Sequence, residues 1–124
     1  MKLVHKSGKV RCNTVKSASY WGCKNLADYG NNGLLTLITN ANKRSILPPA
    51  KDLKVINGCN HKKHFYRLNG THHTSSELVF RALSIHLNVS RNQELQIWYG
   101  QDWADCSEGN NSGETCVDVY AFYP

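Results

Sequence analysis

The clearest pattern in the chain lies near its C-terminal end, where residues 94–123 read ELQIWYGQDWADCSEGNNSGETCVDVYAFY. The segments 94–100 and 115–123 are rich in β-branched and aromatic residues, and apolar side chains alternate with polar ones in the second segment. A period of two is typical of a strand that turns one face toward a core. We therefore expect two strands joined by a polar loop from Gln101 to Glu114.

Shorter runs of the same kind occur earlier, at 34–39, 53–57 and 64–68. Pro48-Pro49 separates the first run from the second, and the turn signal Asn69-Gly70 ends the third, as expected for strands joined by turns. Residues 74–87 fit two structures, because they begin like a helix capping box yet also alternate like a strand. We favour a strand there, since the neighbouring segments are strands, and a helix stays the alternative.

Residues 12–33 are rich in Ser, Gly and Asn and have no sustained period, which predicts a long irregular N-terminal segment held by Cys12 and Cys23. Recurring short strands with turns between them are typical of two packed antiparallel sheets. The chain has 124 residues, a length that suits one domain with its own core. The sequence thus predicts an all-β, disulfide-containing antiparallel β-sandwich, formed as a single domain by residues 1–124.

The cysteines and glycosylation sequons indicate an extracellular protein. The chain has five cysteines, and none is in the C-x-x-C spacing of zinc ribbons or redox motifs. Cys106 and Cys116 flank the polar loop, and we expect a disulfide between them, with one cysteine of the five left over. Sequons begin at Asn69, Asn88 and Asn110, and we expect all three asparagines to be glycosylated. These features together favour secretion. Residues 1–6 are too polar to form a signal peptide, so we expect that it has been removed or replaced by Met1.

The charges are divided along the chain. All fifteen Lys and Arg residues lie before position 92, where they outnumber the acidic residues by twelve, whereas the last 33 residues hold six acidic residues and no basic one. Such asymmetry favours an ionic partner, an ion, or both. It does not define a reaction.

The acidic loop predicts a calcium site. Ca²⁺ takes six to eight oxygen ligands, often from irregular loops. The spacing is not that of an EF-hand, so the alternative is a solvated loop that basic residues elsewhere in the fold neutralise. The expected metal ligands are the five carboxylates of this region, Asp102, Asp105, Glu108, Glu114 and Asp118.

Aromatic and amide side chains next to the loop predict a carbohydrate site. A flat apolar ring supports the face of a sugar, and polar groups bind its hydroxyls. We expect most of the aromatic residues to be in the core and Trp103 to face the ligand. The expected ligand-binding residues are Asp102, Trp103, Asn110, Asn111 and Tyr120.

A second cluster, CNHKKH at 59–64 with His72 and His73 beyond it, contains possible zinc ligands. Its spacing matches no common zinc pattern, so we expect a basic surface patch rather than a Zn²⁺ site. No motif identifies a nucleophile or a general base, and we expect a non-enzymatic protein. A ribonuclease-like hydrolase that uses two histidines is the third possibility for function.

The segments SSELVF and LQIWYGQDWADCSEGNNSGETCVDVYAFY, which lie between residues 75 and 123, resemble the C-terminal modules of secreted cnidarian proteins, including coral skeletal matrix proteins. Gln101 stands where that pattern has an acidic residue. The resemblance implies an extracellular matrix or binding role, and it supplies no catalytic residues.

The sequence therefore predicts a secreted lectin-like module that binds carbohydrate or matrix glycans, with Ca²⁺ as a possible bridge. The alternative is a cationic toxin or defence protein that acts on anionic membranes or glycans. The expected partners are glycans or anionic matrix polymers, with a membrane surface as a further option. Nucleic acid is not expected, because the secretory features argue against it.

Overall fold

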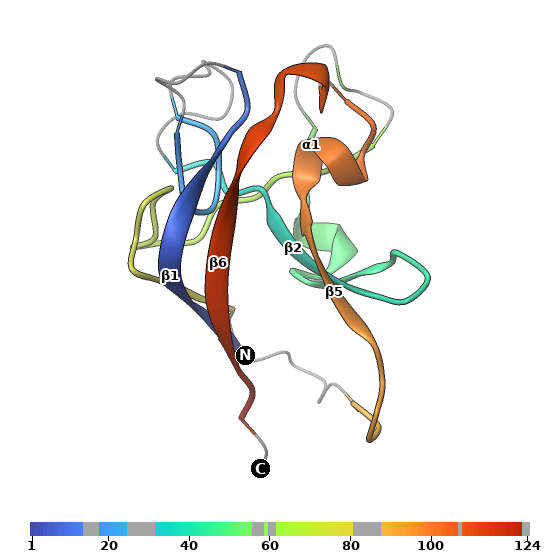
Figure 1. The fold of residues 1–124 in the computed structure, drawn as a ribbon. Coiled ribbons are helices and arrows are strands. Elements are labelled where there is room, and N and C mark those ends of the chain that lie inside the picture. Colours follow the sequence, from blue (N-terminus) through green and yellow to red (C-terminus); the bar gives the residue numbers. More distant parts are fainter. Residues whose placement is uncertain are drawn as a thin grey trace.

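The computed structural model describes residues 1–13, 18–24, 32–55, 59, 62–80, 88–106 and 108–122. Six strands form two antiparallel sheets of three strands each (Figure 1). The first sheet has the order β4 (Glu77–Val79), β1 (Lys2–Arg11), β6 (Ser112–Tyr120), and the second has the order β3 (Ser45–Leu47), β2 (Thr36–Asn40), β5 (Leu95–Tyr99). The predicted all-β sandwich is confirmed.

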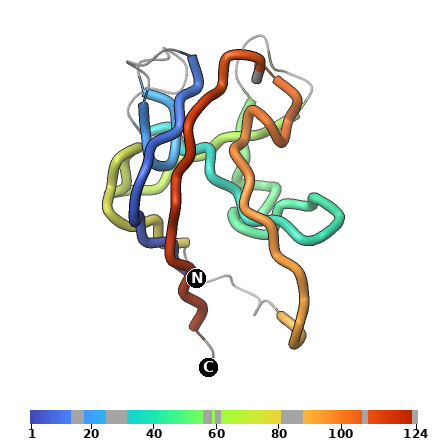
Figure 2. The backbone as a smooth tube through the Cα atoms, in the orientation of Figure 1, coloured from blue at the N-terminus to red at the C-terminus, as the bar shows by residue number. Residues whose placement is uncertain are grey.

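The longest ladder joins the two ends of the chain. β1 pairs with β6 from Lys2 opposite Tyr120 to Arg11 opposite Ser112, with an irregularity between His5 and Ser7. The two strands lie side by side along their whole length, and β1 begins where β6 ends (Figure 2). The 34–39 and 94–100 predictions correspond to β2 and β5, whereas β1 was not predicted from the sequence.

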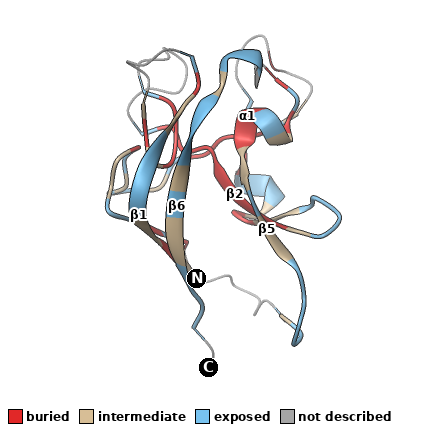
Figure 3. Ribbon diagram, viewed as in Figure 1, coloured by how far each residue is buried: buried red, intermediate tan, exposed pale blue. Residues whose placement is uncertain are grey.

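The second sheet is built on β2, whose first four residues are all buried. Because β2 has neighbours on both edges and is covered on both faces, its buried residues are consecutive rather than alternating. Figure 3 shows this strand as the buried centre of the molecule, while β1 and β6 carry exposed residues.

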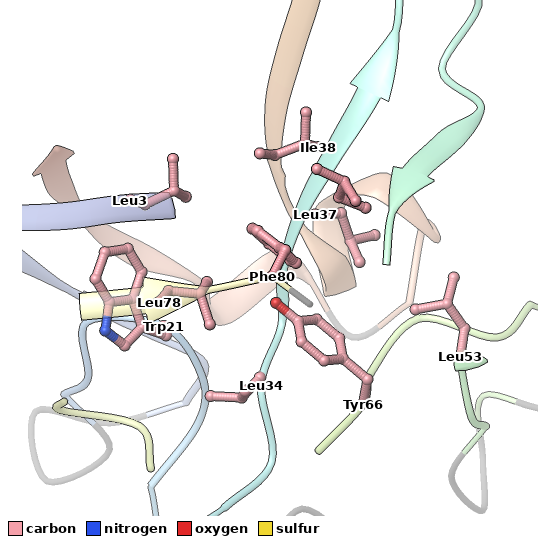
Figure 4. Packing of buried hydrophobic residues seen from close by; sticks show 10 residues of the cluster. Leu3, Trp21, Leu34, Leu37, Ile38, Leu53, Tyr66, Leu78 and Phe80 are labelled. Atoms are coloured by element: carbon pink, nitrogen blue, oxygen red, sulfur yellow. The ribbon is translucent and has the colours of Figure 1, made fainter. Parts of the chain in front are cut away.

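The main core lies between the two sheets (Figure 4). Leu3 and Leu78 face each other across the β1–β4 ladder, and both are fully buried. The Tyr66 hydroxyl donates a hydrogen bond of 2.6 Å to the carbonyl oxygen of Thr36, and burial raises the pKa of this phenol. The buried members of this cluster are Leu3, Trp21, Leu34, Leu37, Ile38, Leu47, Leu53, Tyr66, Leu78 and Phe80.

Two disulfides hold a second buried cluster. They join Cys12 to Cys23 and Cys59 to Cys106, and all four cysteines are buried against Leu35 and Phe65. The predicted Cys106–Cys116 disulfide is therefore wrong. Cys106 lies in this cluster, whereas Cys116 is a free, exposed residue on β6 opposite Ser7. Closeness in sequence was a poor guide because the loop between them turns the two side chains toward different surroundings.

Other predictions have mixed outcomes. The ambiguous segment at 74–87 contains strand β4, and residues 81–87 lie outside the described part of the chain. In place of the predicted strands at 53–57 and 64–68, the structure has two isolated bridges, Lys54 to Phe65 and Leu34 to Tyr66; residues 56 and 57 are not described. Among the described residues, no helix is long and apolar enough to cross a membrane.

The disulfides predict an order of stability losses. A disulfide that closes a longer loop restricts the unfolded chain more, so replacing Cys59 and Cys106 together by Ala should lower the free energy of unfolding by about 4 kcal/mol, and replacing Cys12 and Cys23 by about 3 kcal/mol. Urea denaturation measures both. Cys116→Ser is the control and should change stability by less than about 0.5 kcal/mol. A loss on Cys116→Ser as large as the others would contradict the observed pairing.

Candidate functional site

The predicted loop begins with helix α1 (Gly100–Trp103), which continues directly from β5. The Gly100 amide donates a 2.6 Å hydrogen bond to the carbonyl oxygen of Leu35. A side chain at Gly100 would overlap the carbonyl oxygen of His64, so the helix can pack here only through glycine. This close contact fixes the position of the residues that follow.

Trp103 is half-buried and tightly held. Its indole Nε1 donates to the carbonyl oxygen of Lys43 at 2.9 Å, and the Lys62 ammonium lies 3.7 Å from the ring centroid. One face of the indole is therefore covered by a cation. Such a contact stabilises the ring position and leaves less of the ring for a sugar.

Of the five predicted metal ligands, the four whose side chains are described are not grouped together. Asp102 and Asp105 are exposed at α1, whereas Glu114 and Asp118 lie on β6. Those two strand residues are four apart, about 13 Å along an extended strand. Asp118 instead forms an ion pair with Lys6 at 3.6 Å. The side chain of Glu108, in the short helix η3 (Glu108–Asn110), is outside the described part. Within that part, no three His, Cys, Asp or Glu residues are grouped to hold a metal ion.

The predicted ligand residues differ in how their polar atoms are used. Asn110 donates to the side chain of Asn13 at 3.2 Å. Tyr120 is 46% exposed, and the Lys2 ammonium lies 5.5 Å from its ring centroid. In Asn111, both side-chain polar atoms are buried with no hydrogen-bond partner. Buried polar atoms are nearly always paired in proteins, so this amide is unusual. Because its polar atoms are buried, they are not open to a ligand in this structure.

A pocket of about 530 Å³ lies on the β1–β6 ladder, toward the end where Arg11 pairs with Ser112. The imidazole of His5 stacks on the ring of Tyr20 with centroids 3.5 Å apart. Two more polar atoms at this end of the ladder, Arg11 Nε and Thr115 Oγ1, are buried without a partner. The pocket is lined by His5, Gly8, Lys9, Arg11, Tyr20 and Glu114.

The irregularity in β1 shapes this pocket. Gly8 has φ of +79°, and a side chain there would overlap the carbonyl oxygen of Glu114. Its own carbonyl oxygen lies 2.8 Å from His5 Nε2. Glycine within a strand commonly marks such a bulge, where the chain re-aims neighbouring side chains. The site therefore combines an aromatic pair, two basic residues, a carboxylate and nearby unpaired polar atoms.

This arrangement was compared with known proteins. Neither a protein-family model nor a curated protein matches the chain. Among solved structures, the chain is similar to AJLec, a lectin from the sea anemone Anthopleura japonica, at 30% sequence identity and a TM-score of 0.78. The match covers 94% of this chain and 74% of AJLec.

The chain belongs to the AJLec family. Sea anemones are cnidarians, so the match agrees with the cnidarian relatives that the sequence resemblance implied. The specific matrix-protein module between residues 75 and 123 stays a prediction, because no family model matches it.

The residues considered for a zinc site have other surroundings where the structure describes them. Cys59 is in a disulfide, and His61 lies outside the described part. His64 is fully buried, with Nδ1 3.0 Å from the carbonyl oxygen of Lys62. Burial lowers the pKa of His73, and the neighbouring charges of His72 and Lys24 lower it further.

The three sequon asparagines, Asn69, Asn88 and Asn110, are all exposed. Glycosylation at these positions stays a prediction. The sequence reasoning did not find the pocket residues of β1, because the glycine and the charges in KLVHKSGKVR hide the alternation of Leu3 and His5. A glycine inside an otherwise alternating run was the available signal.

The bulge predicts a difference between two glycines with the same backbone conformation. Gly8 and Gly70 both have φ of +79°, but no atom would lie within 4 Å of a side chain at Gly70. Gly70→Ala should cost about 1 kcal/mol of stability, the cost of the backbone alone. Gly8→Ala should cost about 3 kcal/mol, because the added methyl must also displace β6. Equal losses in urea denaturation would mean that the close contact with Glu114 is absent.

Proposed function

We propose that this protein is a secreted lectin that binds carbohydrate at the pocket end of the β1–β6 ladder. The observation that carries the proposal is the match to AJLec, because it combines 30% identity with coverage of nearly the whole chain. The disulfides support an extracellular location, since they persist in oxidising compartments. Glycans are the proposed partners.

The chemistry of the pocket supports this position for the site. Sugar sites combine an aromatic surface with a few directed polar groups. The stacked His5–Tyr20 pair provides the first, and Glu114 with Lys9 and Arg11 provides the second. Of the residues predicted from the sequence, Glu114 lines the proposed site, whereas Asn111 is not among its lining residues.

The region of α1 is the second place where a sugar could bind. Asp102 and Asp105 are exposed there, and Trp103 lies between them in sequence. Two other predicted ligand residues lie near opposite ends of β6. Asn110 precedes the strand, Tyr120 is its last residue, and both are exposed. The function predicted as an alternative, a cationic effector on anionic membranes, stays a prediction.

A glycan array tests the function, and paired substitutions test the site. Glu114→Ala should weaken binding about tenfold, because a hydrogen bond to the ligand is lost. It should change stability little, since Glu114 is exposed. Glu94→Ala, an exposed carboxylate just before β5, is the control. Binding that survives Glu114→Ala but is lost in Asp105→Ala would place the site at α1 instead. No binding to any glycan would exclude the lectin function.

Calcium dependence is tested separately by thermal and urea denaturation. A ligand that binds only the folded state stabilises it by about 2.7 kcal/mol at a hundred times its dissociation constant. If Ca²⁺ binds near α1, millimolar Ca²⁺ should raise the melting temperature of the wild type, and Asp102→Asn with Asp105→Ala should abolish that rise. Asp52→Asn, an exposed carboxylate in the 3-10 helix Ala50–Asp52, is the control. Equal melting temperatures with Ca²⁺ and with chelator would exclude the predicted calcium site.

A further inference from the structure

The pocket at the β1–β6 ladder is lined by the cation of Arg11. A guanidinium carries five N–H donors in a planar fork that matches carboxylate and sulfate oxygens two at a time. The Nε of Arg11 is itself buried and has no hydrogen-bond partner, so the ligand contact falls to the rest of the guanidinium. Arg11 forms no ion pair with a described residue, so an anionic group in the pocket can pair with this cation without displacing a carboxylate of the protein.

The charges around Arg11 limit how many negative charges the ligand can bring. Lys9 is exposed at the rim, and Glu114 lies directly opposite it in the ladder. Neither Lys9 nor Arg11 forms an ion pair with a described residue. The two cations, Lys9 and Arg11, and the carboxylate of Glu114 leave a net charge of +1, which suits a single anionic group. A polyanion would place further negative charge beside Glu114, and like charges repel at such separations.

The remaining lining suits a sugar ring. The stacked rings of His5 and Tyr20 form an aromatic wall, and Glu114 can accept hydrogen bonds from hydroxyls. A free inorganic anion would use Arg11 and Lys9 but gain nothing from these groups. The volume of about 530 Å³ exceeds what a lone sulfate needs.

We infer that this pocket is the subsite for the acidic group of a saccharide, either a carboxylate or a sulfate ester, with Arg11 as the residue that recognises it. The saccharide class rests on the proposed function, whereas the preference for an anionic group rests on Arg11, Lys9 and Glu114. Neutral sugars would bind the same pocket without the Arg11 contact and therefore more weakly.

Matched sugars separate these contributions. We would titrate the protein with glucose against glucuronic acid and glucose 6-sulfate, and with galactose against galacturonic acid, following the backbone amide signals of Gly8 and Glu114 by NMR. An acidic sugar should bind roughly ten- to a hundredfold more tightly than its neutral counterpart, as expected for a charge-assisted pair. The carboxylate and sulfate arms show which source of negative charge the pocket prefers.

Substitutions then assign the preference to Arg11. Arg11→Gln should abolish the preference for acidic over neutral sugars, while Arg11→Lys should keep only part of it, because Lys lacks the planar fork. Lys9→Gln should weaken acidic sugars by a smaller factor. Arg44→Gln, an exposed cation in the turn before β3, is the control. Melting temperatures of all variants identify any loss due to misfolding.

Three results would overturn the inference in different ways. Equal affinity for neutral and acidic sugars would remove the acidic subsite but keep the proposed lectin function. Equal weakening by Arg44→Gln would show attraction to the whole surface rather than to this pocket. Binding of inorganic sulfate as tight as glucose 6-sulfate would remove the saccharide from the assignment. Loss of all sugar binding, here and on the glycan array, is the separate failure of the proposed function.

Discussion

The pairing of β1 with β6 is the constraint on which the rest of the structure depends. It brings the first residues of the chain against its last strand, and β4 then adds to the free side of β1. Leu3 and Leu78 reach the core only because that sheet forms, and there they meet Leu37 and Ile38 of the second sheet. A contact between segments this far apart in sequence has a high loop-closure cost, which burial of the shared core must offset.

The ladder also accounts for the division of charge along the chain. The basic strand β1 lies against the acidic strand β6, so Lys6 pairs with Asp118 and Lys9 lies opposite Glu114. The basic and acidic parts of the chain, which are separate in the sequence, thus partly neutralise each other where β1 and β6 meet. This corresponds to the alternative in which basic residues from elsewhere in the fold neutralise the acidic segment, at least for Asp118. Asp102 in α1 and Asp105 just after it are exposed and have no such partner in β1.

Sequence reasoning succeeded where one element sets its own pattern. β5 and β6 carry runs of β-branched and aromatic residues. In β2, four consecutive residues are buried, because both faces of the strand are covered. It failed where the pattern depends on a partner. β1 is half exposed and contains a glycine, so its strand character comes from the ladders on both sides of it. The disulfides failed for the same reason, since Cys59 and Cys106 meet through folding and not through closeness along the chain.

The location of the candidate site follows from the same ladder. A regular antiparallel ladder pairs its backbone groups and projects side chains at fixed intervals, which leaves little room for a concave site. The bulge between His5 and Ser7 breaks that regularity. It lets His5 stack on Tyr20 and lets Gly8 approach Glu114 closely, while Lys9 and Arg11 are carried past the ring pair. A substitution that restored a regular strand at Gly8 would therefore remove the pocket even if every other residue that lines it stayed the same.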